Sequence, residues 1–415
     1  MSRSPGRVIG IAVGTLAILA VGVYGPAMLL GPLPAVSVRV DEAQAAAAEP
    51  AAVVLPDDGA SAVALVGESG EAELVASLAD DEPAPIGGAA KLVTALVTVD
   101  SLPLEEGTSG PDIRIGAADY SAYLTYQAEG SRALKVSPGE NWNERDVLRA
   151  LMLASSNNHA DTLATWSFGS VENYVREANG WLEEQGFATL RVADATGLSG
   201  ENVGTAAELA RLAGLVLADP TLGPMFLAGE GPLAADDRRI PDVIAHLGGD
   251  GIRAMSRSYT DEAALSFVFT AEIEVGDETR RLVGAMTGVD DYETLDPAVL
   301  AAVESMQAAS APIEIIPAGA SYGEVRAAWG ERARLVASAA RTDAAFGAAP
   351  DAATVAVEPF TTAAAGRQVG TVTVRLGERD VSSALELDAA IRDPGPVWRL
   401  THPGELIGAF LDGSA

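Results

Sequence analysis

The sequence predicts an α+β fold, followed by a small all-β domain and preceded by one transmembrane helix. Apolar, β-prone runs stand in groups on either side of a helical block rather than alternating with single helices. The composition changes after Asp296, where short segments of strand pattern begin to recur. A long uncharged stretch lies near the N-terminus. With 415 residues, the chain is long enough for two or three domains.

The uncharged stretch covers residues 8–30 and reads VIGIAVGTLAILAVGVYGPAMLL. A helix of this length is about 34 Å long, enough to cross a hydrocarbon core of about 30 Å. Arg3 and Arg7 precede it and no acid does, so the positive-inside bias leaves the N-terminus in the cytoplasm and exports the rest. A cleavable signal peptide is the alternative, although its apolar region usually has only about 7–15 residues. We therefore expect residues 1–33 to be a cytoplasmic stub and a retained single-pass anchor in the cell membrane.

An Ala- and Pro-rich segment, residues 34–56, predicts a linker, and residues 57–300 predict the first domain. That domain should open with a hairpin, because SAVALVG and ELVASL flank the turn GESGE. A capping box at Thr205 predicts the start of a later helix. The other expected helices cover residues 91–99, 143–163 and 170–185, and the expected strands cover residues 264–275 and 281–289.

The second domain should be all-β and cover residues 301–403. After a short helix, PAVLAAVESMQ, the segments IEIIPAG, EVRAAWG, TVAVEPF, VGTVTVRLG and VSSALELD have strand patterns, and TVTVRL alternates strictly. Gly and Pro separate them at intervals typical of a small β domain. Residues 404–415 are expected to be a tail.

Charge and composition exclude several function classes. The chain has 58 acids and 27 bases, a net charge of −31, which argues against a nucleic-acid partner because phosphate binding needs basic surface. It has no Cys, so disulfides, thiolate catalysis and thiolate metal sites are excluded. Only three His are available for a metal site. We expect no metal and no cofactor.

The stretch PAPIGGAAKLVTALVTVD resembles the active-site helix of the penicillin-binding, serine-type D-alanyl-D-alanine carboxypeptidases. In that family a Ser-x-x-Lys pair shares one helix face, so that the Lys amine can take the Ser proton. Lys91 stands at the Lys position, but Gly88 occupies the nucleophile position and supplies no oxygen. Lys91 is one of only two lysines and stands between Ala90 and Leu92. We expect it to be a buried remnant of the pair rather than a solvated helix lysine.

A longer segment, GENWNERDVLRALMLASSNNHADTLATWSFGSVENYV, is similar to the region around the family's Ser-x-Asn motif. Ser155, Ser156 and Asn157 match the motif without a gap. The resemblance implies that Ser155 relays protons to the leaving amine and that Asn157 holds the substrate carbonyl and the Lys. The same residues would also suit an ordinary helix end. With Lys91, these are the candidate catalytic positions.

The family's third motif, Lys-Thr-Gly, binds the substrate carboxylate from an edge strand. In DGIRAMSRSYTDEAALSFVF, its substrate-binding positions fall on Ser256, Arg257 and Ser258, and a later family glycine falls on Ala264. All three motif residues differ. Arg257 could offer a carboxylate a bidentate partner. However, it should point away from Ser256 and Ser258, so we expect a solvated edge-strand arginine.

The resemblance covers about residues 55–403, since VGTVTV and PVWRLTHPGELI also look like the β domain of actinobacterial-type members. It implies a penicillin-binding/β-lactamase-like domain, an antiparallel sheet with a helical subdomain. Because two of three motifs are lost, we expect a catalytically inactive, membrane-anchored homologue outside the cell. It would act at the wall as a scaffold, a regulator or a muropeptide-binding module, with peptidoglycan peptides or cell-wall proteins as partners.

Two alternatives stay open. The first is an active carboxypeptidase that trims terminal D-Ala from peptidoglycan stem peptides with a substitute nucleophile, Thr94 or Ser155. Thr94 lies one turn deeper in an apolar helix, where substrate access is not expected. The second is a purely structural spacer in the envelope.

Overall fold

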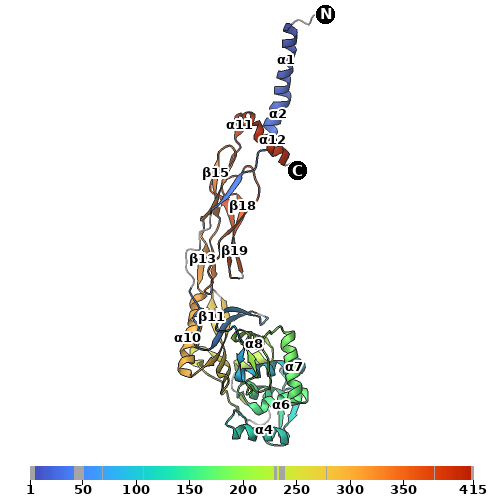
Figure 1. The fold of residues 1–415 in the computed structure, drawn as a ribbon, viewed down its shortest axis with the longest axis vertical. Helices are drawn as coiled ribbons and strands as arrows, with labels where there is room; N and C mark the ends of the chain where they lie inside the picture. The colour runs from blue at the N-terminus through green and yellow to red at the C-terminus, as the bar shows by residue number, and fades with distance from the viewer. Residues whose placement is uncertain are drawn as a thin grey trace. The chain divides into compact units, whose positions relative to one another are not determined.

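The computed structural model describes residues 5–41, 51–67, 69–105, 107–228, 231–232, 239–276, 278–377 and 379–412. The chain forms two compact units (Figure 1). The sheet-and-helix unit comprises residues 51–310, and the β unit comprises residues 1–50 and 311–415. The division after residue 310 differs from the expected boundary at residue 300, because one helix, α10 (Tyr292–Ala309), ends the first unit.

The described part of the sheet-and-helix unit has a five-stranded antiparallel sheet in the order β10-β11-β12-β2-β3. The predicted hairpin is confirmed as β2 (Ala60–Val66) and β3 (Ala72–Leu78). Residues 265–271 are all buried, so both faces of the sheet are covered there. Helix α8 (Ala206–Ala218) packs against β12 and β2, and α10 packs against β11. The remaining strands are β10 (Arg253–Thr260), β11 (Ala264–Val275) and β12 (Glu278–Val289), with β10 at the edge.

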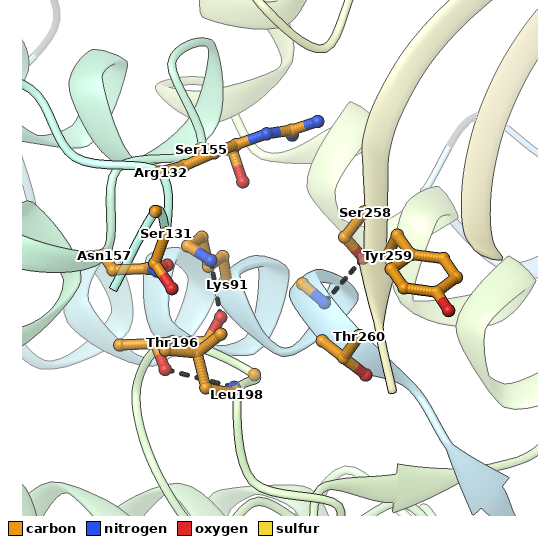
Figure 2. A pocket seen from close by; sticks show the side chains of 13 residues that line it. Lys91, Ser131, Arg132, Ser155, Asn157, Thr196, Leu198, Ser258, Tyr259 and Thr260 are labelled. Atoms are coloured by element: carbon orange, nitrogen blue, oxygen red, sulfur yellow. Dashed lines mark hydrogen bonds between the residues drawn. The ribbon is translucent and has the colours of Figure 1, made fainter. Parts of the chain in front are cut away.

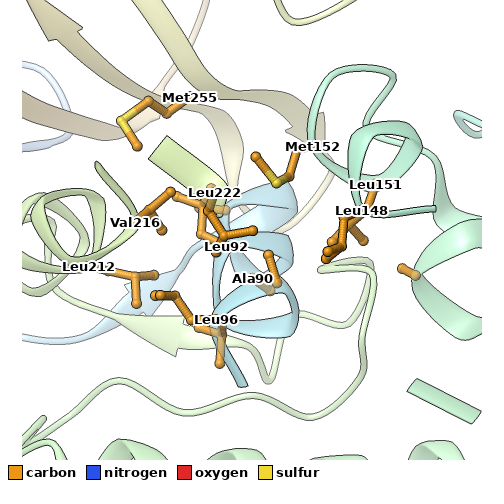
Figure 3. Close-up of a cluster of buried hydrophobic side chains, with 14 of the residues drawn as sticks. Ala90, Leu92, Leu96, Leu148, Leu151, Met152, Leu212, Val216, Leu222 and Met255 are labelled. Carbon is orange, nitrogen blue, oxygen red and sulfur yellow. The ribbon is translucent and has the colours of Figure 1, made fainter. Parts of the chain in front are cut away.

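Helix α3 (Ala90–Ser101) is the central helix, and its residues 90–99 are all buried. Its side chains Leu92 and Leu96 lie among leucine, methionine and valine side chains of the surrounding helices (Figure 3). The capping residues Asn143, Ser170 and Thr205 accept backbone N–H groups at the starts of the next helices. These capped helices are α5 (Glu144–Met152), α7 (Val171–Glu184) and α8. The unit also contains α4 (Ala117–Ala128), α6 (Asn157–Phe168) and α9 (Leu222–Ala228).

The single helix expected over residues 143–163 is two helices. The chain breaks between α5 and α6 at residues 153–156, where Ser155 adopts a left-handed backbone with φ of 47°. Short elements complete the unit: β4 (Ala84–Pro85), β5 (Asp112–Arg114), β6 (Asn141–Asn143), β7 (Val203–Gly204), β8 (Gly231–Pro232), β9 (Arg239–Ile240) and the 3₁₀ turns η2 (Gly87–Ala89) and η3 (Gly248–Asp250).

The β unit has a six-stranded sheet in its described residues, in the order β1-β14-β15-β19-β18-β17. The five segments predicted as strands form β13 (Pro312–Ile316), β14 (Ser321–Arg326), β17 (Thr354–Val357), β18 (Gln368–Leu376) and β19 (Arg379–Leu387). Strands β15 (Arg332–Ala337) and β16 (Arg341–Ala344) were not predicted. Residues 34–56 are not simply a tether, since β1 (Ser37–Val40) pairs with β14.

In the β unit, the described residues nearest to each end of the chain are helical. Helix α1 (Pro5–Leu19), a π-helical segment η1 (Ala20–Tyr24) and α2 (Gly25–Leu30) follow one another. Within them Ile11–Leu30 is long and apolar enough to cross a membrane, by length and composition. The C-terminal residues hold α11 (Gly395–Thr401) and α12 (Pro403–Asp412), so the predicted tail is mostly helix. Helix α12 forms because Leu406, at helical spacing from other apolar residues, is buried against Met28 and Leu33.

The turn between β10 and β11 places Ala264 in a left-handed conformation, with φ of 49°, at the position where the motif resemblance puts a glycine. A left-handed backbone costs an L-residue about 1–2 kcal/mol, and glycine costs about 0.5–1 kcal/mol in unfolded-chain entropy. We expect Ala264→Gly to raise the free energy of unfolding of this unit by about 0.5–1 kcal/mol, measured by urea denaturation.

Its neighbour Ala263 is the matched control, because it is buried and is not among the positive-φ residues. Ala263→Gly should destabilise the unit, since it removes a buried methyl group without relieving strain. Equal destabilisation by both substitutions would contradict the strain at Ala264.

Candidate functional site

A pocket of about 280 Å³ lies where η2, α3, the α5–α6 break, the loop at residues 196–198 and strand β10 meet (Figure 2). The structure brings together Lys91, Ser155 and Asn157 on its wall, and Gly88 and Ser258 also line it. The other two positions of the third motif, Ser256 and Arg257, do not line it. Ser256 is buried and pairs with Val268 of β11.

Gly88 and Ser258 are in direct contact. The backbone N–H of Gly88 donates a hydrogen bond of 2.8 Å to Ser258 Oγ (Figure 2). A Cβ built on Gly88 would lie 2.9 Å from Ser258 Cβ and 3.1 Å from Ser258 Oγ. The first distance is too short for two carbon atoms, and Ser258 Cβ is attached to the backbone of a strand. The space that a side chain at position 88 needs is therefore filled by Ser258.

Lys91 is buried, as predicted, with only 6% of its surface exposed. Its Nζ donates a hydrogen bond of 2.5 Å to the carbonyl oxygen of Thr196. Burial, reinforced by the positive charge of Arg132, lowers the pKa of Lys91 to about 7. The carboxylates of Asp194 and Asp161 act in the opposite direction but do not compensate. Near neutral pH a large fraction of this amine is therefore uncharged.

The loop that receives the Lys91 amine is organised by one carboxylate. Asp194 accepts the backbone N–H groups of Thr196, Gly197 and Ser199 at 2.6–2.7 Å. Burial raises the pKa of Asp194, but these N–H donors outweigh it and hold the pKa below its usual value. This fixed loop presents the Thr196 carbonyl to Lys91.

Between α5 and α6, successive side chains point alternately toward the pocket and away from it. Ser156 donates to Asn158 Oδ1 at 2.8 Å, and Asn158 accepts the backbone N–H of Leu134 at 3.0 Å, so these two hold the break together. Ser155 and Asn157 face the pocket instead. Asn157 is almost fully buried, and its Oδ1 has no hydrogen-bond partner among the described residues. Lys91 bonds to Thr196 rather than to either of them.

The prediction of a solvated Arg257 is wrong. Arg257 does point away from the pocket, but it is only partly exposed. Its guanidinium donates to the carbonyl of Val243 at 2.6 Å, lies 3.3 Å from His246 Nδ1 and stacks 5.8 Å from the centre of the Tyr292 ring. The segment around Val243 and the start of α10 cover this arginine, which sequence alternation along β10 could not reveal.

Arg132 is a pocket residue that the sequence analysis missed. Its guanidinium donates a hydrogen bond of 2.5 Å to the carbonyl of Arg257 on β10. Burial and the nearby charge of Arg257 lower the pKa of Arg132. The arginine joins the segment before β6 to the edge strand. Its residue type was visible in GSRALKV, but no spacing linked it to β10.

Thr94, one of the two substitute nucleophiles considered, lies in the core. It is fully buried and does not line the pocket. Its Oγ1 lies 2.8 Å from the Tyr174 hydroxyl and 2.9 Å from the carbonyl oxygen of Ala195. Thr94 is thus a structural residue, whereas Ser155 remains accessible from the pocket.

The family profile described as D-alanyl-D-alanine carboxypeptidase matches residues 50–276, more than half of the chain. The chain belongs to this family. A D-alanyl-D-alanine endopeptidase of Pseudomonas aeruginosa is 31% identical over 163 residues, which are 39% of this chain and 49% of that protein. The match thus spans about half of the relative's length.

Solved structures of the family share the fold. Penicillin-binding protein 6B from Escherichia coli superposes with a TM-score of 0.56 at 15% identity, covering 79% of this chain and 94% of that one. Penicillin-binding protein 5 from Haemophilus influenzae gives a TM-score of 0.54 at 16% identity, covering 81% and 98%. At these identities the likeness concerns the fold alone.

The motif resemblance aligns residue 88 with the family's Ser and residue 258 with the Gly of its Lys-Thr-Gly, and this chain has Gly88 and Ser258 at these positions. The hydroxymethyl group that fills this space extends from β10.

The lowered pKa of Lys91 can be measured directly, because the chain has only two lysines, Lys91 and the exposed Lys135. In protein labelled with ¹³C at lysine Cε, we expect the Lys91 resonance to titrate with a midpoint near pH 7, since burial disfavours the ammonium form. Lys91→Met identifies the resonance, and Lys135 serves as the internal reference. A Lys91 midpoint above pH 10 would contradict the buried, largely neutral amine.

Proposed function

We propose that this chain is a membrane-anchored, extracytoplasmic and catalytically inactive member of the carboxypeptidase family. It acts at the cell wall as a scaffold, a regulator or a muropeptide-binding module. The observation that carries the proposal is the contact between Gly88 and Ser258: the nucleophile position has no oxygen, and a side chain from another element fills its space.

The chemistry of acyl transfer supports inactivity. A covalent mechanism needs a hydroxyl beside the base and free hydrogen-bond donors for the developing oxyanion. Lys91 still has the lowered pKa of a base, but residue 88 on the same helix face supplies no hydroxyl. The Gly88 N–H, the donor nearest to that position, is already bonded to Ser258 Oγ. Loss of a serine nucleophile alone typically costs about 10⁶ in rate.

Features of the pocket support non-covalent recognition of wall peptides. It has the buried amine of Lys91 and the unpartnered amide oxygen of Asn157. At Ser155 the backbone keeps a left-handed conformation, a strain that usually persists where neighbouring structure holds a functional residue in place. The carbonyl of Arg257 on β10 already accepts a hydrogen bond from Arg132, so a bound peptide would be held by the side chains of the pocket rather than by pairing with β10 along its whole length.

The N-terminal helix supports the proposed location. Ile11–Leu30 has the length and apolar composition of a membrane span, and Arg3 and Arg7 precede it in the sequence. With the N-terminus in the cytoplasm, the sheet-and-helix unit and the part of the β unit that follows the span are exported, and the net charge of −31 favours solubility outside the cell.

Penicillin acylation tests the proposal. The full chain, incubated with fluorescent penicillin, should not be labelled. Gly88→Ser alone should stay unlabelled, because the new side chain collides with Ser258. Gly88→Ser combined with Ser256→Lys, Arg257→Thr and Ser258→Gly should give measurable labelling, since motif residues act as a unit. Because Arg257→Thr also removes the bonds to Val243 and His246, folding of this variant is checked by circular dichroism.

The matched control keeps the other three substitutions but leaves Gly88 in place, so any label that depends on Ser at position 88 is identified. Rapid labelling of the wild-type chain would contradict inactivity. If that labelling were abolished by Ser155→Ala or Ser258→Ala, the abolishing substitution would identify the substitute nucleophile of an active enzyme.

A further inference from the structure

The pocket contains no acidic side chain among the described residues that line it, although the chain as a whole is strongly acidic. The sequence has 58 acids and 27 bases. Only Lys91 and Arg132 among the lining residues can carry a positive charge, and the others are small, apolar or have neutral hydroxyl or amide groups. A cavity whose charges have one sign concentrates ligands of the opposite sign. In so acidic a chain, this lining favours an anionic ligand.

Arg132 supplies the full positive charge of the pocket above pH 7. Burial lowers the pKa of Lys91 to about 7, so its amine is then largely uncharged, whereas a guanidinium stays charged. Burial is also the main cause of the lowered pKa of Arg132, the charge of Arg257 is the next cause, and no carboxylate is among the causes. Arg132 has no ion pair with any residue that the structure describes. Its charge is therefore available to a ligand.

The guanidinium of Arg132 is held in place at the edge of the sheet. Its side chain comes from the segment before β6 and extends across the pocket toward β10 (Figure 2). The bond to the Arg257 carbonyl, 2.5 Å long, uses one of its N–H groups and fixes the position of the planar group. A guanidinium presents pairs of parallel N–H groups that match the two oxygens of a carboxylate. Because the group is already fixed, binding a carboxylate costs less conformational entropy.

The pocket also has an acceptor for a neighbouring N–H group. Asn157 is almost fully buried, and its Oδ1 has no hydrogen-bond partner in the described part of the chain. A buried acceptor without a partner is unfavourable, so a ligand N–H that pairs with it gains affinity. The C-terminal end of a peptide has a carboxylate and an amide N–H on the same residue. This combination fits the pair formed by Arg132 and Asn157 better than an inorganic anion does.

We propose that Arg132 binds the free α-carboxylate of a peptide end in this pocket and makes the pocket selective for the acid over the amide. The inference rests on the proposed function, in its form as a muropeptide-binding module. The motif resemblance assigns carboxylate binding to the positions of Ser256, Arg257 and Ser258, but Arg257 points away from the pocket. In this chain the cation for that role comes from a different element, the segment before β6.

Peptide binding to the full chain at pH 8 tests this selectivity. The probes are N-acetyl-D-alanyl-D-alanine and its C-terminal amide, and binding is followed through the ¹³Cε resonance of Lys91. We expect the acid to bind at least about tenfold more tightly than the amide, because the amide cannot form a charge-assisted bidentate pair. The bound acid should also raise the titration midpoint of Lys91 more than the bound amide does, since a nearby carboxylate favours the ammonium form.

Substitutions of Arg132 separate ligand binding from a structural role. Arg132→Met should bring the ratio of the two affinities to about one, and Arg132→Lys should keep a few-fold preference because it retains the charge without the planar fork. The matched control is Arg176→Met, which removes an exposed arginine of the same unit outside the pocket lining and should leave the ratio unchanged. Circular dichroism checks that each variant is folded.

Four results would overturn the role of Arg132. Equal affinity of the wild-type chain for acid and amide would do so and leave peptide binding standing, as would a preference for the acid that survives Arg132→Met. An equal loss of affinity for both peptides in Arg132→Met would show a purely structural role, through the bond to β10. Inorganic phosphate that binds more tightly than the acid would identify a free-anion site instead.

The proposed function fails in a different way. If neither peptide binds, both this inference and the muropeptide-binding role are overturned. Penicillin labelling tests catalytic inactivity independently of either result.

Discussion

The space between residues 88 and 258 has room for only one side chain. The chemistry of the pocket depends on whether that side chain belongs to residue 88 or to residue 258. Gly88 leaves room for Ser258, and Ser258 Oγ accepts the Gly88 N–H. The neighbouring Gly87 is constrained in the same way: it has φ of 52°, and a Cβ there would lie 2.9 Å from Ser258 Oγ. The turn that opens α3 and the edge strand β10 can approach this closely only because the turn has two consecutive glycines. The absence of a side chain at residue 88 and the presence of a serine at residue 258 are therefore one structural feature.

The pocket owes its electrostatic character to the buried amine of Lys91. Lys91 stays buried with its pKa near 7, below the value of about 10.4 for an unfolded lysine. Unfolding therefore takes up a proton between these pH values, and this group makes the free energy of unfolding rise as the pH rises from about 7 to about 10. Below pH 7 the buried Lys91 amine is charged, and its desolvation lowers the free energy of unfolding by its full amount. On the proposed function, this cost is retained for ligand binding rather than for catalysis.

Sequence patterns predicted the elements that local chemistry determines. The β2–β3 hairpin follows from two apolar runs around a turn, and the burial of Lys91 follows from its apolar neighbours in α3. Contacts between segments far apart in the sequence could not be predicted from local patterns. Strand β1 pairs with β14 across about 280 residues of chain, and Arg257 is covered by residues around Val243 and by Tyr292. The sequence motifs identify Gly88 and Ser258 as two independent differences from the family pattern. Only the structure shows that the two residues share one space.

A double-mutant cycle between residues 88 and 258 tests this account most directly, with the free energy of unfolding measured by urea denaturation. Gly88→Ala should destabilise the sheet-and-helix unit by about 1–3 kcal/mol, because its methyl group overpacks against Ser258. Ser258→Gly alone should cost about 0.5–1.5 kcal/mol through the lost hydrogen bond. In the double variant Ser258→Gly should rescue Gly88→Ala, with a coupling energy of at least about 1 kcal/mol. Additivity of the two effects within about 0.5 kcal/mol would contradict the shared space on which the account rests.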